Sequence, residues 1–152
     1  MKRTLTTSLL ALSILAIGSL SYAADKNVII NANIVGTCAF VDANDVTINM
    51  GDLKAGSGDQ YKTGTTQFWC SNGVSYALET NDGTNAVGSV KHMKSGANVL
   101  PYELNLDHEA GTGAGPNSPI DLTLTAKVNG SDLDSATIAN GYTDTVILTV
   151  NP

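Results

Sequence analysis

Short runs of alternating apolar and polar residues constrain the fold of this chain more than any other feature. The clearest run is residues 120–128, in which five apolar residues share one face and four polar residues share the other. A period of two is typical of a β-strand with one buried face. Asn129-Gly130, a strong turn signal, ends the run.

The same alternation recurs along the chain, and no segment shows a sustained helical period. The separating residues are Gly, Asn, Asp and Ser, at spacings typical of a β-sandwich. Asn72-Gly73 predicts a hairpin, and residues 52–64 read as an exposed loop. We therefore predict an all-β sandwich of about six or seven strands, with strands at residues 27–38, 45–51, 66–70, 74–80, 99–106, 120–128 and 145–150.

Residues 1–23 have the features of a removable secretory signal peptide. Lys2 and Arg3 precede an apolar stretch that is too short to span a bilayer, and Ser21-Tyr22-Ala23 supplies small residues at the cleavage positions. Removing them from the 152 residues leaves 129, the size of one domain. Six basic residues then face fourteen acidic ones, a net charge of −8 that disfavours nucleic acid as a partner.

The two cysteines, Cys38 and Cys70, are predicted to form a disulfide. Export places them in an oxidising compartment, where paired thiols are normally bridged. Closing a loop of about 33 residues stabilises a fold by roughly 3 to 4 kcal/mol in the chain-entropy model.

No residue pattern requires catalysis or a cofactor. His92 and His108 lack metal-ligand spacing, and the oxygen donors Asn105, Asp107 and Glu109 resemble a calcium loop only faintly. Serine motifs of hydrolases are missing from the sequence. We therefore expect neither an enzyme nor a metal or cofactor site.

Several motifs, taken together in this order, resemble the Spore Coat Protein U domain family, which includes subunits of archaic chaperone-usher pili. The resemblance spans nearly the whole chain after residue 23. Its motifs are the N-terminal strand running into Gly36-Thr37-Cys38, then Ile48-Asn49-Met50-Gly51, Cys70 followed by Asn72-Gly73 and Tyr76-x-Leu78, Leu100-Pro101-Tyr102-Glu103-Leu104, and the ending Gly141-Tyr142-Thr143-Asp144-Thr145-Val146-x-Leu148-Thr149-Val150.

The resemblance implies an incomplete immunoglobulin-like sandwich in residues 37–152, completed by a strand that another molecule donates. Residues 24–36 would be the donor segment, and the boundary with the subunit's own first strand would lie within residues 27–36. The implied donor side chains are Val28, Ile30, Ala32 and Ile34, and the implied groove residues are Val146, Leu148 and Val150.

The function implied by the family is that of a pilus subunit exported through the periplasm to the cell surface. Its partners would be a periplasmic chaperone, an outer-membrane usher and neighbouring subunits, with a homopolymer as the product. Adhesion and biofilm formation would follow. The alternative is a secreted coat or binding protein of the same fold whose N-terminal strand completes its own sandwich.

Overall fold

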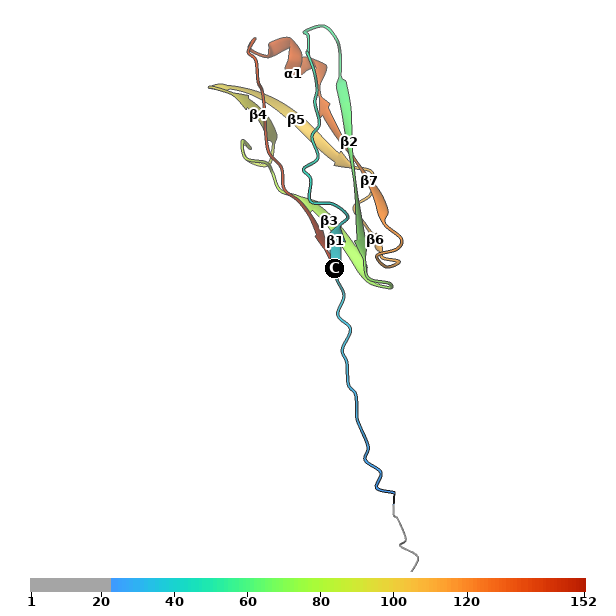
Figure 1. The fold of residues 1–152 in the computed structure, drawn as a ribbon. Helices are drawn as coiled ribbons and strands as arrows, with labels where there is room; N and C mark the ends of the chain where they lie inside the picture. The colour runs from blue at the N-terminus through green and yellow to red at the C-terminus, as the bar shows by residue number, and fades with distance from the viewer. Residues whose placement is uncertain (1–22) are drawn as a thin grey trace, which may run out of the picture. The chain divides into compact units, whose positions relative to one another are not determined.

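Two antiparallel sheets form the fold in the computed structural model, which describes residues 23–152 (Figure 1). The five-stranded sheet has the order β1-β2-β7-β5-β4 and the three-stranded sheet the order β6-β3-β8. The strands are β1 (Cys38–Phe40), β2 (Gln60–Cys70), β3 (Ser75–Thr80), β4 (Lys91–Ser95), β5 (Asn98–Leu106), β6 (Ala110–Thr112), β7 (Ile120–Val128) and β8 (Leu148–Asn151), and the helix α1 (Gly130–Ser135) follows β7.

The core lies between the two sheets. Phe68 of β2 and Leu122 of β7 are fully buried, and Tyr76 and Leu78 reach them from β3 in the other sheet. The rings of Phe68 and Tyr76 meet edge to face at 4.9 Å between centroids. The predicted all-β class is confirmed, and the arrangement is a sandwich of two antiparallel sheets.

Three local expectations were wrong. β2 begins at Gln60, inside the expected loop, because its first half pairs with β7 from Gln60↔Val128 onward. The turn at Asn72-Gly73 joins two sheets instead of forming a hairpin, since β3 pairs with β6 and β8. Asn129, read as a turn, is the N-cap of the six-residue helix α1.

Two predicted strands are extended but not paired into a sheet. Residues 45–51 form no strand, although Val46, Ile48 and Met50 pack on the core with the predicted parity. Of the strand predicted at residues 27–38, the structure has only Cys38 in a strand, where β1 (Cys38–Phe40) begins. Residues 23–33 belong to a different unit from Ile34–Pro152 and, taken by themselves, are extended and exposed. The predicted signal peptide lies, apart from Ala23, outside the described residues.

A disulfide between Cys38 and Cys70 ties β1 to β2 at the edge of the larger sheet. The two residues are direct partners in the ladder, with Cα atoms 4.0 Å apart. Beside the bridge, the backbone N–H of Ser71 donates to the Thr37 carbonyl (2.8 Å). The bridge therefore fixes the point at which the N-terminal segment enters the domain.

Replacing both cysteines with alanine is expected to lower the free energy of unfolding by about 3 to 4 kcal/mol, because the unfolded chain gains the freedom of an open loop. Urea unfolding of the oxidised wild type and the Cys38→Ala, Cys70→Ala variant measures the difference. Reduced wild type serves as the control and should resemble the variant. Equal unfolding free energies in oxidising buffer would contradict the prediction.

Asp59 connects the start of β2 to the end of β7 and to α1. The backbone N–H of Gly130 donates to its carboxylate (2.9 Å) and lowers the pKa of that carboxyl. The Lys127 ammonium, 3.2 Å away, lowers the pKa further. Because the folded-state pKa lies below the ordinary value of 3.8, the carboxylate stabilises the fold above that pH and stops doing so as the pH falls through the folded value.

Asp59→Asn is accordingly expected to lower the melting temperature at pH 7, and its difference from wild type should shrink as the pH falls below about 4. Thermal unfolding across this pH range tests it. Asp52→Asn is the matched control, since Asp52 makes no side-chain hydrogen bond or ion pair within residues 23–152. A difference that stays constant with pH would show that the Asp59 charge is not responsible.

Candidate functional site

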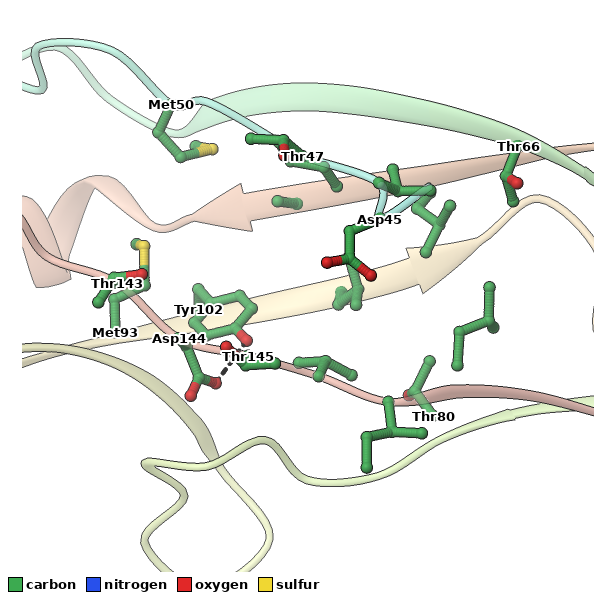
Figure 2. A pocket seen from close by; sticks show the side chains of 18 of the residues that line it. Asp45, Thr47, Met50, Thr66, Thr80, Met93, Tyr102, Thr143, Asp144 and Thr145 are labelled. Atoms are coloured by element: carbon green, nitrogen blue, oxygen red, sulfur yellow. Dashed lines mark hydrogen bonds between the residues drawn. The ribbon is translucent and has the colours of Figure 1, made fainter. Parts of the chain in front are cut away.

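A long groove with a cavity volume of about 710 Å³ opens into the core of the sandwich. Figure 2 shows two extended segments on opposite sides of it, with β5 and β7 between them. Residues 43–50 form the first wall, and residues 142–148 form the second. The floor is apolar and consists of Leu104, Leu124, Ala126 and Val128.

The first wall has no ladder of its own. Within residues 23–152, positions 43–50 make no backbone–backbone hydrogen bond, and the last such bond before them joins the Val41 N–H to Gln67. Packing holds the wall in place: a Cβ atom on Gly64 of β2 would lie 2.6 Å from Val46 and 2.8 Å from Ile48. The absence of a side chain at Gly64 thus lets the wall lie close against β2.

The second wall is paired along one edge only. Thr143 exchanges backbone hydrogen bonds with Lys94, the Thr145 carbonyl accepts from Thr84, and the Ile147 carbonyl accepts from Asn81. Only odd-numbered positions take part, and bonded groups alternate sides along a strand. The backbone groups of Asp144 and Val146 have no hydrogen-bond partner anywhere in the described part of the chain.

The groove therefore combines an apolar floor with two walls whose facing backbone edges are unpaired. An unpaired edge is a template for another strand, and it is costly to leave beside an apolar core. Chemically, the site is suited to bind an extended peptide, whose backbone would satisfy the walls and whose alternate side chains would contact the floor.

A hydrogen-bonded carboxylate fixes one end of the second wall. The Tyr102 hydroxyl of β5 donates to Asp144 Oδ2 (2.7 Å), and the backbone and side-chain amides of Asn85 donate to Oδ1 (3.0 and 3.1 Å). Burial raises the pKa of the Tyr102 phenol, and the hydrogen bond and negative charge of Asp144 raise it further. These contacts join residues 142–148 to β5 and to the loop after β3.

The groove residues implied by the family resemblance are partly among the lining residues. Val146 and Leu148 line the groove, whereas Val150 packs against the buried cluster around Phe68 and is not among the lining residues. Sequence reasoning predicted a strand at residues 45–51 but did not assign it to the groove. The alternation of Val46, Ile48 and Met50 was the signal in the sequence that could have indicated a wall with one buried face. Sequence reasoning also missed the floor, whose residues belong to strands that were correctly predicted but not placed relative to one another.

The implied donor residues lie in the exposed N-terminal segment. The exposed fractions are 80% for Val28, 88% for Ile30 and 98% for Ile34, and Ala32 is exposed as well. Apolar side chains at this exposure are unfavourable in water.

Neither metal ligands nor a membrane-spanning helix emerges from the residues that the structure describes. No cluster of three or more His, Cys, Asp or Glu side chains is placed to hold an ion within residues 23–152. His108 contacts Asp107, its neighbour in the chain, at 2.9 Å. Among the same residues, no helix is long and apolar enough to cross a membrane.

The fold and groove define a class of protein: a disulfide-bridged β-sandwich with a groove that opens into its core. The model of the Spore Coat Protein U domain family matches residues 24–149, and the chain belongs to that family. A comparison with the curated proteins gave no match.

Among the solved structures, one match is the crystal structure of the CsuC–CsuE chaperone–tip adhesion subunit pre-assembly complex, from the archaic chaperone-usher Csu pili of Acinetobacter baumannii. The sequence identity is 19% and the TM-score 0.46. The match covers 77% of this chain and 40% of the matched chain, so this chain spans less than half of that one.

Tyr102→Phe is expected to destabilise the fold by about 1 to 2 kcal/mol, because Asp144 loses a hydrogen-bond donor in a half-buried site. Amide hydrogen exchange at residues 143–147 should accelerate together with the loss of stability. Tyr142→Phe is the matched control: its hydroxyl donates to the Thr137 carbonyl (2.7 Å) in an exposed position. Wild-type exchange at residues 143–147 in the Tyr102 variant would contradict the role assigned to this contact.

Proposed function

We propose that this protein is a structural subunit of a surface pilus, assembled by donor-strand exchange through the chaperone-usher pathway. The N-terminal segment of one subunit fills the groove of its neighbour, and repetition of this contact produces a homopolymer. The observation that carries the proposal is the groove itself, in which two unpaired backbone edges flank an apolar floor.

The N-terminal segment has the chemistry that this groove requires. Its apolar side chains Val28, Ile30, Ala32 and Ile34 share one face and are exposed, and Ile29 and Val35 are apolar residues on the opposite face. Each large side chain stabilises by roughly 1.5 to 3 kcal/mol when fully buried, and Ala32 by less. New backbone hydrogen bonds to both walls add to this, so an inserted strand is bound tightly.

Export and assembly follow from the same physics. A subunit with an open groove exposes core residues and strand edges, which favours aggregation before assembly. A periplasmic chaperone would occupy the groove temporarily, and an outer-membrane usher would exchange it for the next subunit's segment. Membership of the Spore Coat Protein U domain family supports this route. The signal peptide at residues 1–23, the donor segment at 24–36 and the sandwich at 37–152 are the corresponding parts of the chain.

The role is structural and not catalytic, and the fibre would present the outer faces of the sandwich at the cell surface. Adhesion and biofilm formation are the activities we assign to such a fibre. A secreted protein that completes its own sandwich is the alternative, and it differs in one respect that can be measured: it would be a stable monomer when expressed alone.

Placing aspartate at Val28, Ile30 and Ala32 should abolish polymers, because three carboxylates would have to be buried against the groove floor. The variant should still form a soluble complex with the cognate chaperone, since its own groove is unchanged. Co-expression with and without that chaperone, followed by size-exclusion chromatography, measures both.

The matched control places aspartate at Asn27, Asn31 and Asn33, which lie on the opposite face of the same segment. It introduces the same number of charges and should still polymerise. If the variant with a charged apolar face polymerised as well as this control, donor-strand exchange through these residues would be ruled out. A wild-type chain that is a stable monomer without chaperone would favour the self-completed alternative.

A further inference from the structure

The two ends of the groove differ in the carboxylates that are free to bind a cation. Asp42 and Asp45 lie where the first wall begins, whereas Met50, at its end, packs with Met93 and Tyr142 against one buried cluster. Figure 2 shows the Asp45 side chain projecting into the cavity. Neither carboxylate forms an ion pair within residues 23–152, and Asp42 accepts one hydrogen bond, from the Asn44 backbone N–H (2.9 Å).

The third carboxylate of the lining is already occupied. Asp144 accepts hydrogen bonds from the Tyr102 hydroxyl and from both amides of Asn85. Asp42 and Asp45 therefore keep more acceptor capacity for an incoming cation than Asp144 does, and both lie where the first wall begins.

The N-terminal segment has a matching polarity. Lys26 is the one basic residue among positions 24–37. In an extended strand it shares a face with Val28, Ile30, Ala32 and Ile34, because all have even numbers, and Asp25 points to the opposite face. The apolar stripe is thus preceded by a cation on the side that enters a groove.

The lengths agree as well. Eight residue steps separate Lys26 from Ile34, and eight separate Asp42 from Met50, a span of about 26 Å in each case when extended. A strand parallel to the first wall would place Ile34 level with Met50 and Lys26 level with Asp42. The reverse direction would place the Lys26 ammonium among Met93 and Tyr142, where the nearby lining carboxylate, that of Asp144, already accepts three hydrogen bonds.

We propose that Lys26 of the incoming subunit binds Asp42 and Asp45 of the acceptor subunit, and that this contact sets the direction and register of the inserted strand. The inference rests on the proposed function, because the occupant of the groove is a second copy of this chain. It states that a charge contact, and not only the apolar face of Val28, Ile30, Ala32 and Ile34, sets the register of the inserted strand. Being near the surface, the contact acts mainly on the rate and specificity of assembly.

The test is a charge reversal in the full mature chain. Lys26→Glu should slow polymer formation by about 3-fold to 10-fold at low ionic strength, with a smaller effect in high salt. Adding Asp42→Lys and Asp45→Lys to the same chain should restore the rate, since every interface then carries the reversed pair. Lys54→Glu is the matched control, because Lys54 is exposed and does not line the groove.

A second combination, Lys26→Glu with Asp45→Lys alone, keeps the hydrogen bond between Asp42 and Asn44 and should restore part of the rate. This double variant tests whether the polymerisation rate is restored even if the triple variant folds poorly. A Lys26→Glu rate equal to that of Lys54→Glu, or no gain in either combined variant, would overturn the charge contact. Polymers in these variants that still depend on Val28, Ile30 and Ala32 would leave the proposed function intact. If the wild-type chain itself formed no polymers, the proposed function would be overturned instead.

Discussion

The unpaired backbone along the groove is the constraint on which the rest of this structure depends. Buried N–H and C=O groups are almost always hydrogen-bonded, because an unmet partner costs free energy comparable to a lost hydrogen bond. Within residues 23–152, residues 43–50 pair with no strand, and the backbone groups of Asp144 and Val146 form no hydrogen bond. These two edges border an apolar floor that belongs to the core of the sandwich. Extended chain satisfies such a site well, because it supplies donors and acceptors along its whole length together with side chains for the floor.

The groove stays open only if contacts on the outer sides of its two walls hold the walls in place. The disulfide and the Ser71–Thr37 hydrogen bond fix the chain just before the first wall. Val46 and Ile48 of that wall pack against Gly64, where a side chain would leave no room for them. The second wall is attached through Lys94, Thr84 and Asn81 on its outer edge and through the Asp144 network at one end. The bonds that shape the groove thus lie on its outer sides, which leaves the inner edges free.

The sequence predicted the individual strands better than their arrangement. Alternation identified β7 and the buried faces of β3 and β5, because a period of two depends only on which side of a strand is buried. The same alternation at residues 45–51 predicted a strand where the structure has an unpaired wall, since side-chain parity does not reveal whether a neighbouring strand exists. The first half of β2 was missed because Gln60 to Thr63 gain their order from pairing with β7, a contact distant in sequence. The groove floor combines residues of β5 and β7, so only the fold could reveal it.

A groove of this kind couples the stability of the subunit to its assembly. The side chains of Val46, Ile48 and Leu148 are only partly buried, so the core contributes less hydrophobic stabilisation than a closed sandwich would. Any strand that binds the folded state and not the unfolded chain raises the stability by an amount that grows with its effective concentration. In the fibre proposed above, a neighbouring subunit would supply that strand at a high local concentration, whereas a dilute subunit would lack it. Under the proposed function, the open strand position would make the isolated subunit the least stable form and the polymer the most stable, and this difference would give assembly its direction.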